Sequence, residues 1–247
     1  MFEDIYPTQI LHRNAELDAL SRLLEPAQYS RSAENALIHG PSGVGKTASA
    51  RWMLRDLRQR EGVNSALIEC SGGTRNGILH ETIEKYPKGT VVHRNQPHEE
   101  LLKMFQKIAD EPFIIALDEA DVIPDLDVLG DLFSIDEVSV IAITHSDTEW
   151  LNRVDRNLRS QFHGDRQIEY RKYRVPELVD ILEPRVEHGL IGNPVSIDQL
   201  EWIADETGGL HGTRSNPCLP PPRLRWIATM GRSAKTMFET RSIAPSA

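Results

Sequence analysis

The chain has 247 residues, of which 39% are hydrophobic and 26% are charged, so it is long enough for one large domain or two modest ones with a buried core. It contains no apolar run long enough to span a bilayer, and its first four residues lack the basic start of a signal peptide, so we expect a cytoplasmic protein with no membrane partner. Cys70 and Cys218 lie far apart without metal-ligand spacing, which argues against a zinc site and indicates a reducing compartment.

The charge is unevenly distributed along the chain. The formal net charge is −9, but residues 210–247 carry +5, so residues 1–209 carry −14. Only seven of the 28 basic residues are lysines. An acidic surface with few lysines is typical of a salt-rich cytosol, where self-repulsion is screened. DNA is not excluded as a partner, because phosphate contacts need only local arginines.

The first predicted elements are a strand, a glycine-rich turn and a helix. Residues 36–39 form a short apolar run, and residues 48–54 contain helix formers. Between them the chain fits the Gly-x-x-x-x-Gly-Lys-[Ser/Thr] motif of nucleoside triphosphatases, with the residues Gly40, Pro41, Ser42, Gly43, Val44, Gly45, Lys46 and Thr47. A glycine-rich turn with a chance Lys-Thr is the alternative interpretation.

This motif predicts a triphosphate ligand. The glycines let backbone N–H groups, up to Ala48 in the first turn of the helix, surround the phosphates at the helix N-terminus. Lys46 brings a positive charge to the β and γ oxygens, and Thr47 offers its hydroxyl to Mg²⁺.

Further strand and helix signals alternate after the motif, as in a parallel sheet covered by helices on both faces. Strands are predicted at 66–70, 113–117 and 138–144, and a helix at 98–109 that Pro112 stops. Because ligands of open parallel sheets bind at the carboxyl ends of the strands, the polar residues that follow these strands should face Thr47.

Asp118 and Glu119 follow the strand predicted at 113–117, and Asp118 lies 72 positions after Lys46. We expect Asp118 to orient the metal and Glu119 to polarise the attacking water. The alternative is that two carboxylates merely end a strand. Asp121 is either a support for the metal ligands or an exposed loop carboxylate.

At the end of the next strand stand Thr144, His145 and Ser146, each a candidate to hold the water from the other side. His145 has no partner at metal-ligand spacing. Further on, Arg159 lies in a segment, 155–160, from which an arginine can reach the triphosphate of a neighbouring subunit. Solvated helix charge is the equal alternative there.

Beyond about residue 175 the chain changes character. Helices are predicted from Pro176 to about residue 188 and over 196–204, with Ser196 as the N-cap. From Leu210 helical periodicity stops and prolines accumulate. The predicted domains are a nucleotide-binding α/β domain over 1–174, a partial helical lid over 175–209 and an irregular tail over 210–247.

With these motifs the chain resembles the AAA+ ATPases, and among them the archaeal replication initiators related to the origin recognition complex and cell division control protein six. The likeness runs from Tyr6 to about Gly209. It rests on Tyr6-Pro7, on His12 to Leu17, which is similar to a family segment beside the adenine, on the phosphate-loop motif, on 117–121, on the strand before His145, and on 152–160.

The resemblance implies a parallel P-loop sheet with a small helical lid, ATP or ADP with Mg²⁺ as ligands, and Tyr6 and Ile10 beside the nucleotide. It also implies origin DNA, other initiator subunits and the replicative helicase as partners.

The chain departs from the family pattern at several positions. The family usually has Asn where this chain has His145 or Ser146, and usually Arg where it has Asn157, so we expect slow or altered ATP hydrolysis. Arg214 is a poor substitute for the family's arginine beyond Gly209. No winged-helix domain of about 100 residues follows before Ala247, which predicts weak or absent binding of origin DNA.

The abrupt change at Leu210 favours a shifted reading frame. With permitted codons for 211–217, an offset of two bases reads Arg-Tyr-Ala-Val-Gln-Ser, which restores a helical sequence. The alternative is a disordered proline-rich terminus. For function, the alternatives to a truncated initiator are a nucleotide-dependent signalling regulator without an origin role and a non-functional product with an incomplete lid.

Overall fold

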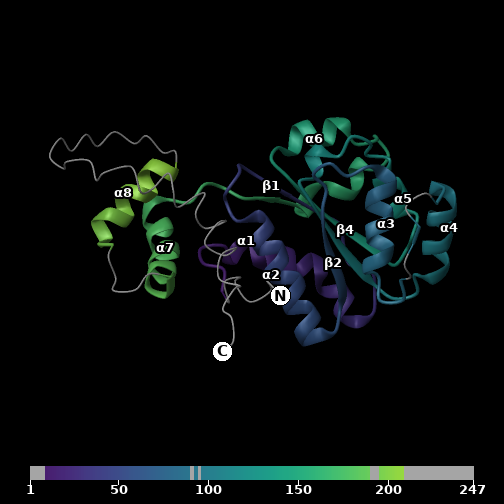
Figure 1. Ribbon diagram of the computed structural model, residues 1–247, viewed down its shortest axis with the longest axis horizontal. Helices are drawn as coiled ribbons and strands as arrows, with labels where there is room; N and C mark the ends of the chain where they lie inside the picture. Colours follow the sequence, from purple (N-terminus) through teal and green to yellow (C-terminus); the bar gives the residue numbers. More distant parts are fainter. Residues whose placement is uncertain (1–8, 90–91, 94–95, 190–194, 209–247) are drawn as a thin grey trace, which may run out of the picture. The chain divides into compact units, whose positions relative to one another are not determined.

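The computed structural model describes residues 9–89, 92–93, 96–189 and 195–208 (Figure 1). Within them lies a five-stranded parallel sheet with the strand order β2-β3-β4-β1-β5. The strands are β1 (Ala36–His39), β2 (Asn64–Glu69), β3 (Phe113–Asp118), β4 (Val138–Thr144) and β5 (Gln167–Glu169). β1 therefore lies beside β4, although β2 and β3 separate them in the chain.

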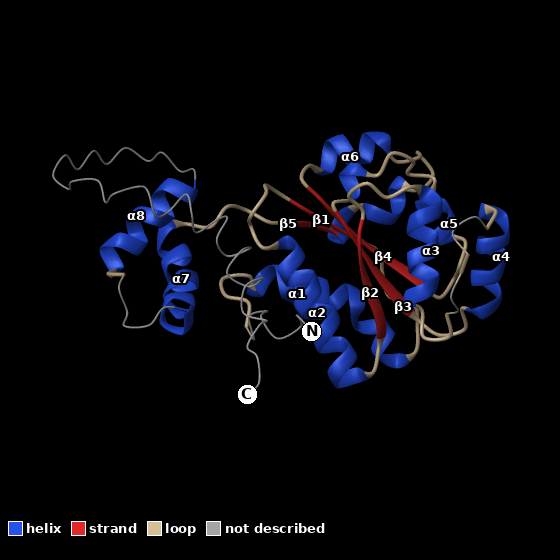
Figure 2. Ribbon diagram, in the orientation of Figure 1, coloured by secondary structure: helices blue, strands red, loops and turns tan. Residues whose placement is uncertain are grey.

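Helices cover both faces of this sheet (Figure 2). One face packs against α1 (Asn14–Leu24) and α2 (Lys46–Glu61). The other packs against α3 (Arg75–Lys85), α4 (His98–Ile108), α5 (Val128–Phe133) and α6 (Asp147–Arg153). Short 3₁₀ helices lie at Glu25–Tyr29, Ala120–Val122, Arg159–Phe162 and Gly164–Arg166. The predicted α/β fold with a doubly covered parallel sheet is confirmed.

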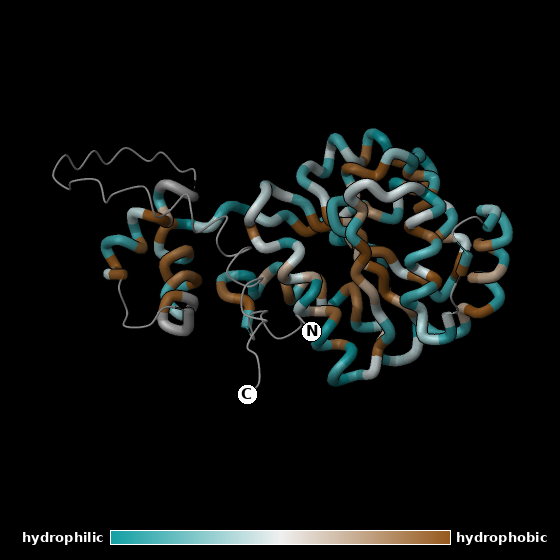
Figure 3. Tube along the Cα trace, in the orientation of Figure 1, coloured by the Kyte–Doolittle hydropathy of each residue, from teal (hydrophilic) through white to brown (hydrophobic). Residues whose placement is uncertain are grey.

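Successive side chains of the central strands point to opposite faces of the sheet and so belong to two separate hydrophobic cores. In β3, Phe113, Ile115 and Leu117 pack toward α3 to α6, whereas Ile114 and Ala116 pack toward α1 and α2. All five are almost completely buried, which explains why β3 is an unbroken apolar run in the sequence (Figure 3). Each large side chain buried in this way stabilises the fold by about 1.5–3 kcal/mol.

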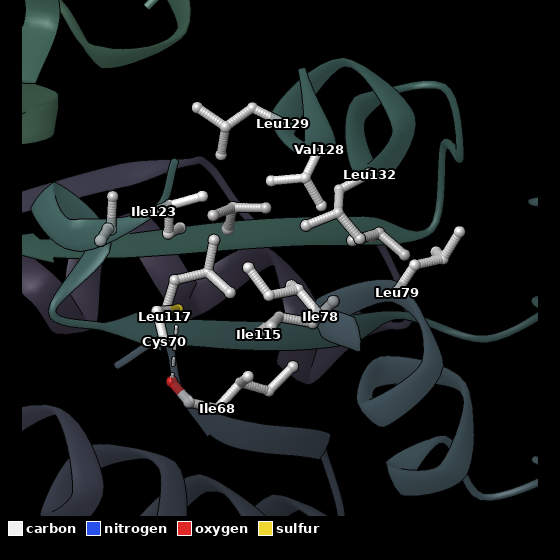
Figure 4. Close-up of a cluster of buried hydrophobic side chains, with 14 of the residues drawn as sticks. Ile68, Cys70, Ile78, Leu79, Ile115, Leu117, Ile123, Val128, Leu129 and Leu132 are labelled. Carbon is white, nitrogen blue, oxygen red and sulfur yellow. Dashed lines mark hydrogen bonds between the residues drawn. The ribbon is translucent and has the colours of Figure 1, made fainter. Parts of the chain in front are cut away.

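Cys70 belongs to the first of these cores (Figure 4). It directly follows β2, is fully buried, and its Sγ lies 3.7 Å from the carbonyl oxygen of Ile68. Burial raises the pKa of its thiol to about 12, with smaller contributions from nearby carboxylates such as Asp118. Cys70 is therefore a small core residue, as the sequence indicates.

Two further helices follow the sheet, α7 (Val175–Gly189) and α8 (Ile197–Gly208), which pack against each other. Ser196 caps α8 as predicted: its Oγ accepts from the Gln199 N–H at 3.4 Å, and the Gln199 side chain accepts from the Ser196 N–H at 2.9 Å. In the part of the chain that the structure describes, no helix is long and apolar enough to cross a membrane.

Some predicted boundaries differ from the structure. β2 begins at Asn64 rather than Ala66, because Asn64 and Ser65 pair with Phe113 and Ile114 of β3 despite their polarity. Several elements, among them α1, α3, α5 and β5, have no counterpart among the predicted elements. The predictions for residues 210–247, including the shifted reading frame, lie outside the described residues, as does Arg214.

Candidate functional site

A cavity of about 300 Å³ opens at the carboxyl edge of the sheet. β1, β4 and β3 are neighbours there, so the segments that follow them converge. The residues that line the cavity come from the loop after β1 and from the ends of β3 and β4: Ser42, Gly43, Gly45, Lys46, Thr47, Ala48, Asp118, Glu119, Ile143, Thr144 and His145. The polar strand ends thus face Thr47, as predicted.

The loop between β1 and α2 has a backbone that requires glycine. Gly43 and Gly45 have φ values of +78° and +93°, in the left-handed region that side chains disfavour. Gly40 is required for a second reason, since a Cβ there would lie 2.1 Å from the carbonyl oxygen of Tyr170. The loop leads directly into α2, whose first residues Lys46 and Thr47 line the cavity.

Lys46 is buried, with an exposed fraction of 7%. Its ammonium donates hydrogen bonds to the carbonyl oxygens of Gly40 and Pro41, both at 2.7 Å. Burial lowers the pKa of Lys46 below its ordinary value, and the negative charges of Asp121 and Asp118 oppose this shift. The site therefore holds a desolvated cation whose charge an anionic ligand would compensate.

Thr47 and Asp118 meet across the edge of the sheet. The Thr47 hydroxyl donates to Asp118 Oδ1 at 2.9 Å, so the loop motif and the end of β3 form one site. These two oxygen donors fit Mg²⁺, which usually binds one or two protein ligands together with substrate phosphates. The described residues include no cluster of three or more His, Cys, Asp or Glu side chains that could hold a metal ion.

Glu119 follows with an unusual backbone. Its φ of +55° is rare for a residue with a side chain, and its N–H donates to Asp118 Oδ1 at 3.1 Å. Left-handed backbone of this kind costs of the order of 1 kcal/mol and is concentrated at functional sites. The turn leaves Glu119 exposed on the cavity wall.

His145 lies on the same wall and is held by Asp121. Their side chains approach to 2.6 Å between Nδ1 and Oδ2. The other carboxylate oxygen of Asp121 is buried and accepts no hydrogen bond from the described residues. Sequence spacing left the role of Asp121 open, and the structure makes it the partner of His145.

Other predicted site residues do not line the cavity. Ser146 instead caps α6, where its Oγ accepts from the Glu149 N–H at 3.4 Å. Arg159 donates to the carbonyl oxygens of Val154 and Asn152. Gly40 and Pro41 also lie outside the cavity lining, where their carbonyl oxygens accept from Lys46. Ile10 packs against the core beside α1 and α2, Val44 is buried, and Tyr6 lies outside the described residues.

Sequence reasoning missed one buried residue beside the loop. Arg13, which the sequence indicated only as part of the family segment near the adenine, donates to the carbonyl oxygen of Val44. No spacing rule connects the two positions, which are 31 residues apart.

Comparisons with known proteins identify the family of the chain. Residues 29–154 match the AAA domain family. The chain is 32% identical over 206 residues to ORC1-type DNA replication protein 9 of Halobacterium salinarum, covering 82% of this chain and 58% of the relative. It is 30% identical over 209 residues to ORC1-type DNA replication protein 1 of the same organism, covering 83% and 68%. The chain thus spans about three fifths of the length of these relatives.

Solved structures share the fold. The Aeropyrum pernix ORC1 protein in complex with DNA matches with 28% identity and a TM-score of 0.62, over 76% of this chain and 52% of that one. Cdc6p from Pyrobaculum aerophilum matches with 22% identity and a TM-score of 0.68, over 82% and 56%, which is a likeness of fold alone. From the AAA domain and the identity to its relatives, the chain belongs to the ORC1-type replication protein family of AAA ATPases.

Proposed function

We propose that the chain binds and hydrolyses ATP with Mg²⁺ as the nucleotide module of a DNA replication initiator. The observation that carries the ATPase part is the 2.9 Å hydrogen bond between Thr47 and Asp118. It brings a hydroxyl at the start of α2 and a carboxylate at the end of β3 to one point, beside a loop built to surround phosphate. A chance glycine-rich turn would have no reason to meet a strand-ending carboxylate.

The loop binds the phosphates in this proposal. Backbone N–H groups of the glycine turn and of the first turn of α2 donate to phosphate oxygens at a helix N-terminus. Lys46 exchanges its two carbonyl acceptors for oxygens of the β- and γ-phosphates, which relieves the cost of its burial. Thr47 and Asp118 hold Mg²⁺, which supplies neutralisation of the charge on the phosphates.

Glu119 and His145 act on the water. Glu119, exposed on the cavity wall, orients the attacking water and accepts its proton. Because Nδ1 of His145 is turned toward Asp121, its Nε2 is available to a second water or phosphate contact. In this arrangement His145 holds the water, a role for which the family usually has Asn. Because the residue differs, we propose that hydrolysis is slow.

The replication role rests on family membership. The ORC1-type relatives favour an initiator over a signalling regulator. One related structure contains DNA, so we propose origin DNA, other initiator subunits and the replicative helicase as partners of the whole protein. Arg159 remains a proposed contact to a neighbouring subunit's triphosphate; its guanidinium would first have to leave the carbonyl oxygens of Val154 and Asn152.

Equilibrium binding of a fluorescent ATP analogue, with Mg²⁺ and with EDTA, tests the module. We expect saturable binding that weakens when Mg²⁺ is removed, and slow phosphate release from ATP. Asp118→Asn should remove most of the Mg²⁺ dependence while leaving the fold intact. Binding that is unaffected by both EDTA and Asp118→Asn would contradict the assignment. Fluorescence anisotropy with duplex DNA at several salt concentrations measures the DNA partner separately.

A further inference from the structure

Arg13 is a buried cation just before α1. Its exposed fraction is 4%, which is unusual for arginine and requires partners for its N–H groups. Nε and Nη2 donate to the carbonyl oxygen of Val44 at 3.2 and 2.9 Å, and Nη2 also donates to the carbonyl oxygen of Arg171 at 2.6 Å. Nη1 donates to Glu16 at 2.8 Å. Arg13 therefore joins α1, the loop after β1 and the segment after β5.

The same guanidinium stacks on two aromatic rings. Its Cζ lies 3.9 Å from the ring centre of Tyr173 and 5.1 Å from that of Tyr170. Both tyrosines belong to the segment between β5 and α7. Cation–π contacts at these distances are favourable, more so where water is excluded. The rings fix the plane of the guanidinium and thus the direction of its hydrogen bonds.

These residues contact the phosphate loop at three points along its length. At its start, the Tyr170 carbonyl oxygen packs so closely on Gly40 that no side chain would fit. In its middle, Arg13 binds the carbonyl oxygen of Val44. At its end, the Tyr173 hydroxyl would lie 2.9 Å from a Cβ on Gly45.

The contact to Val44 has a geometric consequence for the cavity. In a trans peptide, the C=O of one residue and the N–H of the next point in opposite directions. Holding the Val44 carbonyl toward Arg13 therefore turns the Gly45 N–H away from Arg13. Gly45 lines the cavity and Val44 does not. The contact therefore sets the direction of the N–H of a residue on the cavity wall.

We infer that Arg13, seated on Tyr173, is a positioning residue that holds the phosphate loop in its ligand-binding conformation. The inference rests on the proposed nucleotide function and deepens it. Arg13 touches no ligand in this role; it fixes the direction of a backbone donor that does. Lysine cannot replace it, because an ammonium lacks the planar fork that reaches Val44 and Arg171 together and stacks on a ring.

Equilibrium binding of a fluorescent ATP analogue with Mg²⁺, together with steady-state hydrolysis, tests the inference in the full chain. We expect Arg13→Lys to weaken binding and raise KM roughly ten-fold with little change in kcat, since the lost donor serves ground state and transition state alike. Tyr173→Leu should weaken binding roughly three- to ten-fold, and Tyr173→Phe should recover most of the affinity because it keeps the ring. Arg58→Lys, which alters an arginine that donates to Ser65 away from the cavity, should change neither KM nor kcat.

Thermal unfolding without nucleotide separates positioning from a purely structural role. If Arg13→Lys and Tyr173→Leu lower the Tm but leave affinity and KM at wild-type values, the inference is wrong. If Arg13→Lys does not fold, the comparison of Tyr173→Leu with Tyr173→Phe decides. Absence of ATP binding by the wild type overturns the proposed function and this inference together, whereas wild-type binding with unaffected variants overturns this inference alone.

Discussion

Replacing Lys46 with alanine is the most direct perturbation of the candidate site. Lys46 has an exposed fraction of 7% and donates to two backbone carbonyl oxygens at 2.7 Å, and burial lowers its pKa. In the nucleotide-free protein its removal has opposing effects. The carbonyl groups of Gly40 and Pro41 lose a donor, which costs about 1–3 kcal/mol, and the desolvation of an ammonium is relieved. We therefore expect a small change in Tm without ligand.

The effect of Lys46→Ala should appear when nucleotide is added. A charge-assisted hydrogen bond contributes about 1.5–3 kcal/mol, so its loss weakens binding roughly ten- to 150-fold. At a nucleotide concentration about 100 times the wild-type Kd, ligand stabilises the wild type by about 2.7 kcal/mol. The same concentration should stabilise Lys46→Ala by about 0.3–1.4 kcal/mol.

Differential scanning fluorimetry with and without Mg²⁺ and ATP measures this difference. For a domain of this size the wild-type Tm should rise by about 5–11 °C, and that of Lys46→Ala by less than about 6 °C. Lys103→Ala is the matched control, because Lys103 lies on the surface of α4 with only a 4.0 Å ion pair to Glu99. An undiminished shift in Lys46→Ala would refute the assignment of the phosphate site.

Three further predictions concern catalysis and the core. Glu119→Gln should keep nucleotide affinity while kcat falls by roughly 10²- to 10⁴-fold, measured as phosphate release. Asp121→Asn should lower kcat roughly ten-fold at unchanged Kd, because His145 loses its charged acceptor; an equal loss in a His145→Ala background would contradict that coupling. In a Cys218→Ala background, Cys70 should resist a disulfide reagent at pH 8 until the protein unfolds. The folded pKa of Cys70 is raised to about 12, so its contribution to the free energy of unfolding is complete below the unfolded pKa of about 8.5. Above that pH the free energy of unfolding falls by about 1.4 kcal/mol per pH unit. Cys70→Ala should abolish this pH-dependent loss, measured as the urea midpoint at each pH.

The central strands are predictable from the sequence because both of their faces are buried. β4 coincides with its predicted range, since every residue from Val138 to Thr144 is buried and the run is apolar apart from Ser139 and Thr144. β5 has only three residues, of which Ile168 alone is buried, so it has no periodicity to detect. Its existence depends on pairing with β1, a contact between distant segments.

The candidate site likewise has one part that the sequence predicts and another that depends on the fold. The phosphate loop is recognisable because its ligand contacts come from consecutive backbone groups, so the required glycines stand at fixed spacing. The pairing of Asp121 with His145 spans 24 residues and depends on the adjacency of β3 and β4. Each residue was identified as a candidate, but only the fold decides that the carboxylate orients the imidazole.

The contacts of Arg13, which holds the phosphate loop without touching a ligand, also depend on the fold. Arg13 binds the backbone of Val44, 31 residues away, and that of Arg171, 158 residues away. Carbonyl acceptors place no demand on side-chain identity at either position, so no motif records the contact. An intact phosphate-loop motif is therefore necessary for binding but does not fix the direction of its own N–H groups. Lys46→Ala and Arg13→Lys should consequently both weaken affinity, one by removing a ligand contact and the other by releasing a backbone donor that the motif still contains.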